Sequence, residues 1–432
     1  YLRFAQHESL VDPDDEVTIY NLDSSQGFES FSTQVHTIIT NHGKGIFYVF
    51  DSLSDLLSAW ATDLMIGNFF LITCPYLFEL DTIAYFAIVR NRHSYATVAR
   101  IRETTQVLLD TYNCDDDFYI QPLKVWKRYS PTMFLPHLES GDRFIPVTNS
   151  VDASKLFCHM TRFSESSRRN LDYWDRLFIM AEDLLAGGSS TEEKAAMVRQ
   201  LTEILITRDP RMSELVMEHM TLDDILGIKE RLIGSGFIGG KSVGLLLARK
   251  ILEKDSETDW VRYLEPHDSF YIGSDVFYSY LVNNGCWKLR MEQKTHDGFF
   301  TVAPILSEKM LQGEFPEDIR EHFLQIIEYF GQSPIIVRSS SLLEDSFGNA
   351  FAGKYESIFC ANQGSPQERY ERFEAAVKRI FASTMNEDAL IYRRQRGLEF
   401  HDEQMALLVQ RVSGSYRKHY FFPDIGGVGV SR

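Results

Sequence analysis

Continuous apolar runs alternate with helical periodicity over the first 150 residues of the chain. We predict strands at residues 45–51, 69–76, 85–93 and 117–129. An amphipathic pattern over 96–112 predicts a helix between the last two strands. Strands that helices cover on both faces lack polar alternation, so these runs favour an α/β fold with a parallel sheet over residues 1–150.

The pattern becomes helical after residue 150, and Ser190 with Glu193 has the capping-box signature that opens a helix. After residue 228 a glycine-rich turn, short strands and long helices follow one another. We therefore predict an α/β multidomain protein of three parts. They are an α/β domain at 1–150, a helical connector at 151–228 and an α+β domain at 229–432.

The amino-acid composition of the chain excludes some classes of partner and function. The 432 residues include 44% hydrophobic and 24% charged side chains, as in soluble globular proteins, and the net charge is −17. Nucleic-acid binding rests on a positive surface, so we expect no nucleic-acid partner. The five cysteines are scattered without a CxxC pair, which favours reduced thiols and a cytoplasmic protein. Pro75, Glu79 and Asp81 interrupt the longest apolar stretch, so we expect no membrane partner.

The first candidate for chemistry is the glycine-rich turn in GSGFIGGKSVGLLLARKIL. Gly239, Gly240 and Lys241 stand immediately before an apolar-periodic helix. Glycine permits close backbone approach to a phosphate, helix N-terminal N–H groups favour an anion, and lysine adds a mobile charge. The turn is not a Walker A loop, because that motif needs glycine where this chain has Ser235. The alternative is a glycine turn that only caps a surface helix.

The second candidate is PIIVRSSSLLEDSFGNAFAGKYESIF, residues 334–359. Its apolar start predicts a buried strand ending on Arg338, whose planar guanidinium suits phosphate oxygens. The three serines that follow could donate further hydrogen bonds, and Glu344 could orient Arg338 or attract a metal-bound phosphate. Glycines up to Gly353 would allow the intervening loop to fold over a ligand. The alternative is a structural pair of Arg338 with Glu344 that closes a hairpin.

The third candidate is ALLVQRVSGSYRKHYFFPDIGGVGVSR, in which an apolar strand ends at Gln410. Backbone groups at the end of such a strand can face an adenine edge. The alternative is an ordinary β-hairpin.

Taken in order and spacing, these three segments resemble the nucleotide-binding domain of phosphoenolpyruvate synthase and pyruvate, phosphate dikinase, which has an ATP-grasp-like fold. The resemblance covers about 229–432. It implies that Lys241 and Arg338 contact ATP phosphates and act in catalysis, and that backbone near Gln410 meets adenine. It further implies Mg²⁺ and a loop from Glu344 to Gly353 that closes over the phosphates.

The residues that the resemblance assigns to nucleotide binding are Gly239, Gly240, Lys241, Arg338, Ser339, Ser340, Glu344, Gly353, Lys354 and Gln410. Lys354 stands where this family usually has glutamine, which adds positive charge and could alter nucleotide preference. The family carries its phosphorylated histidine on a separate domain, and none of the twelve histidines here has that setting. The implied partner is therefore a phosphocarrier-histidine domain outside this chain.

The N-terminal part has a resemblance of its own. GIFYVFDSLSDLLSAW is similar to a Walker B strand and its following helix in RecA-like and KaiC-type ATPases, where Asp51 would hold magnesium. The alternative is that Asp51 caps the next helix. The Walker A loop would precede Tyr1, so the domain would be truncated or degenerate, and we expect the chain to be part of a longer protein.

Three functions stay open at this point. The first is the ATP-binding portion of a dikinase-like phosphotransferase. The second is a regulatory nucleotide sensor that transfers nothing. The third is an assembly module, in which the KaiC-like domain drives homo-oligomer formation.

Overall fold

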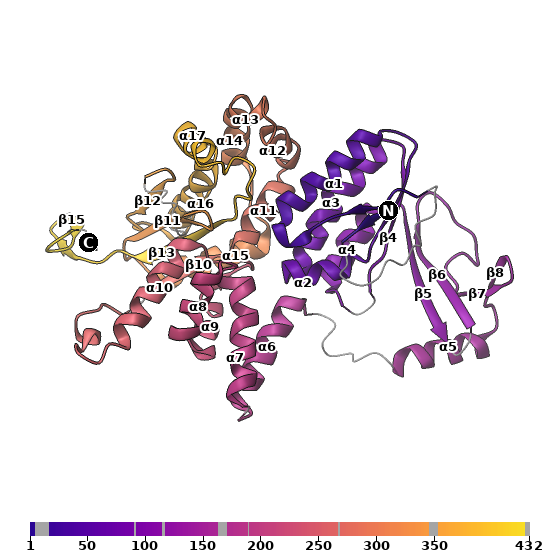
Figure 1. The fold of residues 1–432 in the computed structure, drawn as a ribbon, viewed down its shortest axis with the longest axis horizontal. Helices are drawn as coiled ribbons and strands as arrows, with labels where there is room; N and C mark the ends of the chain where they lie inside the picture. The colour runs from indigo at the N-terminus through magenta and orange to yellow at the C-terminus, as the bar shows by residue number, and fades with distance from the viewer. Residues whose placement is uncertain are drawn as a thin grey trace. The chain divides into compact units, whose positions relative to one another are not determined.

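The computed structural model describes residues 1–4, 17–89, 92–114, 117–162, 171–188, 190–266, 268–344 and 353–427. The chain divides into two compact units, Tyr1–Leu177 and Phe178–Arg432, with the boundary inside helix α6 (Tyr173–Ala186) (Figure 1). Residues 178–228, most of the predicted connector, belong to the second unit. No helix in the described ranges is long and apolar enough to cross a membrane.

A four-stranded parallel sheet forms the centre of the first unit. Its order is β2 (Tyr20–Asn21), β1 (Leu2–Arg3), β3 (Phe47–Phe50) and β4 (Ile83–Phe86). The helices of this unit are α1 (Phe28–His42), α2 (Leu57–Trp60), α3 (Asp63–Glu79), α4 (Tyr95–Thr104) and α5 (Ser150–Arg162), with short 3₁₀ turns at Ser24–Gln26 and Leu53–Leu56. The parallel sheet predicted for this part of the chain is therefore present.

The covering of this sheet differs from the prediction. Phe31, Phe50 and Phe69 are almost completely buried between the sheet, α1 and α3. On the opposite face Phe47 is 68% exposed and Tyr85 60% exposed. Alternate residues of β3 and β4 therefore face solvent, and the apolar run reflects one buried face and one exposed apolar face.

Two predicted elements in the first unit are wrong. Residues 69–76, predicted as a strand, lie inside α3, which begins after the Thr62 cap. The apolar side chains of α3 are spread around the helix, buried at Phe69 and Phe70 but 54% exposed at Phe78, so its sequence has no clear helical periodicity. A short apolar run without that periodicity does not distinguish helix from strand. The helix predicted over 96–112 ends at Thr104, and the chain continues as a strand from Val107. Thr104 and Thr105, both β-branched, stand at the change.

That strand belongs to an antiparallel sheet that the sequence pattern did not indicate. The sheet runs in the order β5 (Val107–Cys114), β6 (Asp117–Val125), β7 (His137–Ser140) and β8 (Arg143–Pro146). The described part of residues 1–150 thus contains one parallel and one antiparallel sheet.

The second unit begins with a helical layer. Its helices are α7 (Thr191–Leu201), which continues as a π-helix (Thr202–Ile206), α8 (Pro210–His219) and α9 (Leu222–Lys229). The predicted capping box at the start of α7 is confirmed, because Ser190 Oγ accepts from the Glu193 N–H and the Glu193 carboxylate accepts from the Ser190 N–H. Thr221 with Asp224 repeats the motif at α9.

A mixed five-stranded sheet forms the core of the second unit. Its order is β12 (Ser357–Cys360), β11 (Ile335–Ser341), β13 (Met405–Arg411), β10 (Ser269–Ile272) and β9 (Leu232–Ile233). All neighbours are antiparallel except β9 and β10. The other elements are α10 (Gly240–Glu253), α11 (Ser274–Asn283), α12 (Trp287–Gln293), α13 (Gly298–Thr301), α14 (Ala303–Gln312), α15 (Glu317–Phe330), α16 (Pro366–Ser383), α17 (Glu387–Gln395) and the hairpin β14 (Ser415–Arg417) with β15 (Tyr420–Phe422).

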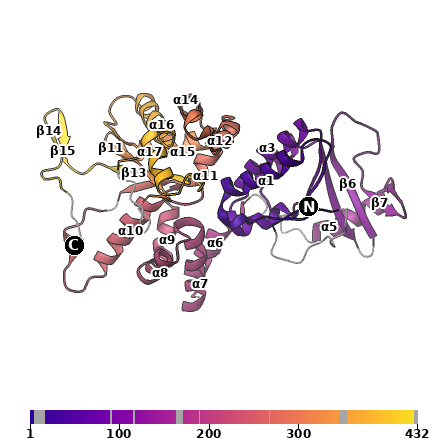
Figure 2. The same ribbon diagram turned by 45° about the horizontal axis from the view of Figure 1, so that its top comes forward.

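Helices α10 and α16 lie on opposite sides of this sheet (Figure 1 and Figure 2). Strand alternation places Ile335 and Val337, both 0% exposed, on the side of α16. Ile336, Arg338 and Ser340 point to the other side, where Ser340 meets the start of α10. We call this second side the α10 face.

Candidate functional site

The glycine-rich turn is positioned by its contact with the end of β11. Gly239 caps α10 with φ +81°, and a Cβ on it would lie 1.3 Å from the Ser340 carbonyl oxygen. A Cβ on Gly240 would lie 1.9 Å from the Glu344 carbonyl oxygen. Only glycine fits at such distances, and the positive φ of Gly239 adds to the requirement. These two glycines bring the start of α10 against the segment that follows Arg338.

Lys241, the next residue, forms an ion pair across this contact. Its Nζ lies 2.5 Å from Glu344 Oε1 and donates to Ser339 Oγ at 3.0 Å. The Glu344 side chain is 1% exposed, whereas the Lys241 side chain is 21% exposed. The lysine ammonium thus stands at the boundary between a buried carboxylate and solvent.

Glu344 is held by donors from three residues. Ser339 Oγ donates to Oε1 at 3.0 Å, and the Ser341 backbone N–H donates to Oε2 at 3.0 Å. Burial raises the pKa of the Glu344 carboxyl, while the Lys241 ammonium and these hydrogen bonds act in the opposite direction. The carboxylate fixes the lysine beside the end of β11.

The serines after Arg338 have protein partners in this structure. Ser339, Ser340 and Ser341 are all 0% exposed. Ser340 Oγ donates to the Ile238 carbonyl at 2.9 Å and accepts from the Ser242 N–H at 3.1 Å. The structure shows the hydroxyls bracing β11 against the glycine turn, and the phosphate contact assigned to Ser339 and Ser340 stays a prediction.

Arg338 is half-buried on the α10 face of β11. The prediction that the strand ends on Arg338 is wrong, because the pairing of β11 with β13 continues to Ser341. The strand neighbours of Arg338 are Ser357 on β12 and Leu408 on β13. The predicted alternative, an Arg338–Glu344 brace, is not found, because Glu344 pairs with Lys241. Among the described residues the Arg338 side chain has no hydrogen-bond or ion-pair partner, so its charge is available to a ligand.

Gln410 lies on the same face, one register step further along the sheet. It stands opposite Ile336 on β11 and opposite Ser269 on β10, and its Nε2 donates to Ser269 Oγ at 3.3 Å. Phe359 on β12 also pairs with Ile336 and is 70% exposed. This exposed ring was not selected from the sequence, because a single apolar residue in a short strand gives no signal of which face it occupies.

The loop between Glu344 and Gly353 falls outside the described residues from 345 to 352, so its predicted closure is not tested. Gly353 has φ +73° with open space around it, as a turn glycine requires. The Lys354 ammonium lies 5.7 Å from the centre of the Tyr392 ring on α17. This cation–π contact is what the structure shows for Lys354, and its predicted effect on nucleotide preference stays a prediction.

A buried polar cluster that the sequence did not indicate holds both sides of that loop. Glu403, 0% exposed, accepts from Ser341 Oγ at 2.6 Å and from the Tyr355 hydroxyl at 2.7 Å. Its third partner is the Arg393 guanidinium on α17, at 2.6 Å. Because Ser341 precedes the loop and Tyr355 follows it, one carboxylate positions both ends.

Asp51, the predicted magnesium ligand of the first unit, follows β3 and is 4% exposed. Its Oδ2 accepts from the Phe4 backbone N–H at 2.8 Å, and its Oδ1 accepts from the Tyr1 hydroxyl. The following 3₁₀ turn is capped by Ser52 without a side-chain hydrogen bond. These contacts of Asp51 connect β3 to β1, and its role as a magnesium ligand stays a prediction.

The comparison with protein families concerns the second unit. Residues 235–432, less than half of the chain, match the family model described as pyruvate phosphate dikinase, AMP/ATP-binding domain. The matched range contains Gly239, Lys241, Arg338 and Gln410, so the candidate site of the second unit lies within it. The match supports the predicted relation to phosphoenolpyruvate synthase and pyruvate, phosphate dikinase, and it indicates AMP/ATP binding by this part of the chain. The RecA/KaiC-like assignment of the first unit stays a prediction, since many α/β domains contain a parallel sheet.

Proposed function

We propose that residues 229–432 are the ATP-binding portion of a phosphoenolpyruvate synthase- or pyruvate, phosphate dikinase-like phosphotransferase. ATP binds on the α10 face as its magnesium complex, and a phosphoryl group passes to a carrier histidine outside this chain. The observation that carries the proposal is the position of Arg338. A permanent charge without a protein partner among the described residues lies on one sheet face with Gln410 and beside the start of α10.

The register gives the order of contacts along the ligand. Arg338 stands two residues along β11 from Ile336, which is the partner of Gln410. Two residues of strand span roughly 6.6–6.8 Å, about the offset between a nucleoside and its phosphates. Adenine would therefore lie near Gln410 and the exposed Phe359 ring, and the phosphates near Arg338 and Lys241.

Each basic residue has a distinct part in this arrangement. Arg338 offers a planar fork to two phosphate oxygens, and its charge is present at any physiological pH. Lys241 is held by Glu344, so its ammonium is positioned before the nucleotide arrives and loses little side-chain freedom on binding. Positioning and charge neutralisation of this kind are the main contributions of protein to phosphoryl transfer.

Magnesium would be supplied with ATP. In the described ranges no group of three or more His, Cys, Asp or Glu side chains could hold a metal ion. Magnesium in phosphoryl-transfer sites is bound chiefly by substrate phosphates and water with one or two carboxylates. Glu344, the acid nearest the proposed phosphates, is already paired with Lys241, so we assign it to positioning the lysine and derive no step through the metal.

Calorimetry with Arg338 variants of the whole chain tests this proposal. Loss of a charge-assisted phosphate contact costs roughly 1.5–3 kcal/mol, so Arg338→Ala should weaken ATP binding about tenfold to a hundredfold. AMP should lose much less, because it has no β- or γ-phosphate. Arg338→Lys should not restore the affinity, because lysine keeps the charge without the fork.

Arg262→Ala is the matched control, since Arg262 is a highly exposed arginine of the same unit. It should leave both affinities unchanged. An equal loss of ATP and AMP affinity in Arg338→Ala, with a lower melting temperature, would mean that Arg338 only supports the fold. Transfer of label from ATP to a histidine of this chain would contradict the external carrier.

A further inference from the structure

The glycine turn of the proposed nucleotide site is held by the start of α11. The Gly273 N–H donates to the Ile233 carbonyl at 3.0 Å, and the Ser274 N–H donates to the Phe237 carbonyl at 3.0 Å. In return, Ser274 Oγ accepts from the Phe237 N–H at 3.0 Å. The first residues of α11 therefore fix the backbone of the turn that leads into α10.

Asp275 forms the carboxyl part of this contact. It is the second residue of α11 and is 8% exposed. Its N–H donates to the Ser235 carbonyl at 3.2 Å, and its Oδ2 accepts from Ser235 Oγ at 2.9 Å. A Cβ on Gly236, which has φ +83°, would lie 2.6 Å from Asp275 Oδ1. The carboxyl group is thus packed directly against the turn, and residue 236 has to be glycine.

The surroundings of this carboxyl group disfavour its ionised form. Burial raises the pKa of Asp275 to about 7, while the Ser235 hydroxyl and the Arg208 guanidinium act in the opposite direction. Arg208 comes from the segment before α8, and its guanidinium lies 5.4 Å from the centre of the Phe237 ring. The turn itself, GSGFIGG at 234–240, contains no titratable side chain. The first N–H groups of α11, which would favour a carboxylate, already donate to the Phe237 and Ser235 carbonyls.

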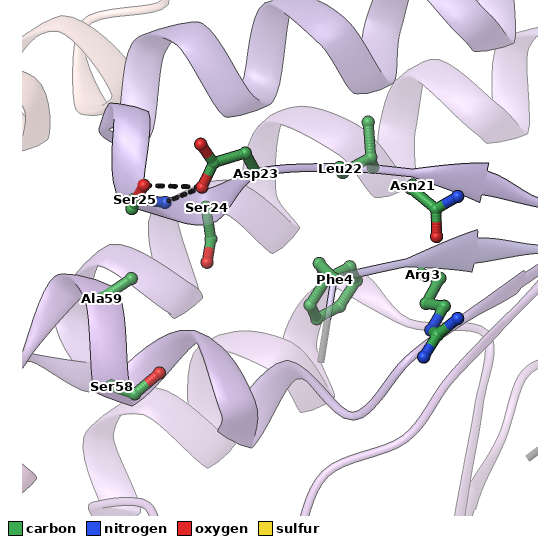
Figure 3. Close-up of a pocket in the computed structure, with 9 residues that line it drawn as sticks. All are labelled: Arg3, Phe4, Asn21, Leu22, Asp23, Ser24, Ser25, Ser58 and Ala59. Carbon is green, nitrogen blue, oxygen red and sulfur yellow. Dashed lines mark hydrogen bonds between the residues drawn. The ribbon is translucent and has the colours of Figure 1, made fainter. Parts of the chain in front are cut away.

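An aspartate of the first unit shows the contrasting case. Asp23 is exposed in the lining of a pocket of about 560 Å³ (Figure 3). Its carboxylate accepts from the Ser25 N–H at 2.9 Å, from Ser25 Oγ at 2.6 Å and from Gln26 Nε2 at 3.2 Å. Water and these donors stabilise its negative charge. Among the described residues, Asp275 accepts one side-chain hydrogen bond, and it is shielded from water.

We infer that Asp275 is a positioning residue of the nucleotide site, whose uncharged carboxyl group holds the glycine turn in the geometry that accepts ATP phosphates. This inference rests on the proposed function. Loss of the proton places a negative charge in the contact between α11 and the turn. Water stabilises that charge once the turn separates from Asp275, and the turn then no longer presents Lys241 beside the end of β11. ATP affinity should therefore fall as the pH rises through about 7.

Calorimetric titrations of the whole chain with ATP from pH 6 to pH 8 test this inference. Because the phosphates of ATP also titrate, the quantity to compare is the ratio of wild-type to Asp275→Asn affinity at each pH. Asparagine keeps the size and an acceptor oxygen for Ser235 but cannot ionise. Linkage to one proton predicts that this ratio falls about tenfold over this range.

Two further variants separate this role from simple support of the fold. Ser235→Ala removes a hydrogen bond that stabilises the carboxylate, so it should move the decline in affinity to higher pH. Asp23→Asn is the matched control, since Asp23 also accepts from a serine hydroxyl, and its ratio to wild type should stay constant. Hydrogen exchange of residues 234–240 without nucleotide should show protection lost with rising pH in wild type but not in Asp275→Asn.

The outcomes distinguish this inference from the proposed function. A constant ratio of wild-type to Asp275→Asn affinity, in a protein that binds ATP, overturns the inference and leaves the proposed function standing. Equal pH dependence of hydrogen exchange in the two proteins, at residues 234–240, also overturns it. If the wild-type chain binds no ATP at any pH, the proposed function fails and the inference fails with it.

Discussion

Removal of the Glu403 carboxylate is the strongest test of how the second unit positions its site. Glu403 is 0% exposed and the Arg393 side chain 1% exposed, so both charges are outside water. Breaking a buried ion pair by removing one partner costs about 3–5 kcal/mol, because the other charge stays buried. Arg393 keeps the His401 carbonyl as an acceptor at 2.8 Å, so we expect the lower half of that range for Glu403→Ala.

The same change should weaken ATP binding for a separate reason. Ser341 and Tyr355 both donate to Glu403, and they stand on the two sides of the loop that follows Glu344. Without the carboxylate both ends of that loop lose their common anchor. Glu403→Gln keeps the shape and an acceptor oxygen, so it should recover part of the stability and part of the affinity.

Urea unfolding measures the free energy of unfolding of each variant. Because the chain has two units, a global unfolding signal does not show which unit is destabilised, so hydrogen-exchange mass spectrometry is used to locate the loss of stability in the second unit. Glu321→Ala, at an exposed position on α15, is the control and should change the free energy of unfolding by less than about 0.5 kcal/mol. A loss below about 1 kcal/mol for Glu403→Ala, with full exchange protection of β11, would refute the reasoning.

Three other predictions follow from single contacts. Gly239→Ala should displace the start of α10 and lower both stability and ATP affinity. Gly244→Ala, with open space around it, should instead stabilise the same helix by roughly 0.4–1 kcal/mol, and melting temperatures and calorimetry compare the two variants. Asp51→Ala should lower the free energy of unfolding by roughly 1–3 kcal/mol, because the Phe4 N–H loses its acceptor, and a loss of ATP affinity at unchanged stability would contradict this. Burial and the neighbouring Asp63 raise the pKa of Asp172 to about 8, so the folded protein holds a proton that the unfolded chain releases. Its contribution to stability is complete below about pH 4 and is lost as the pH rises through about 8; Asp172→Asn should flatten the pH dependence of urea unfolding in this window, and an unchanged slope would exclude the raised pKa.

The sequence by itself determined those features whose signal is local. The capping box of Ser190 and Glu193, the glycine turn before α10, and a buried strand carrying Arg338 can each be recognised within a few residues, because caps, positive φ angles and strand alternation are properties of short segments. The order of these motifs also indicated the nucleotide-binding family of residues 229–432, which the family match supports.

Tertiary structure decided those features of the fold and of the site that depend on contacts between residues distant in the sequence. The apolar run at residues 69–76 forms part of helix α3 rather than a strand, and its sequence has no clear helical periodicity from which this could be predicted. Lys241 and Glu344 are 103 residues apart, and Ser341 and Glu403 are 62 apart. Both pairs form only because the sheet places β11 against α10 and β13. Residue types identify groups that can bind an anion, but which of them is already neutralised inside the protein and which faces a ligand depends on this long-range packing. That is why Arg338, and not Lys241, is without a partner among the described residues.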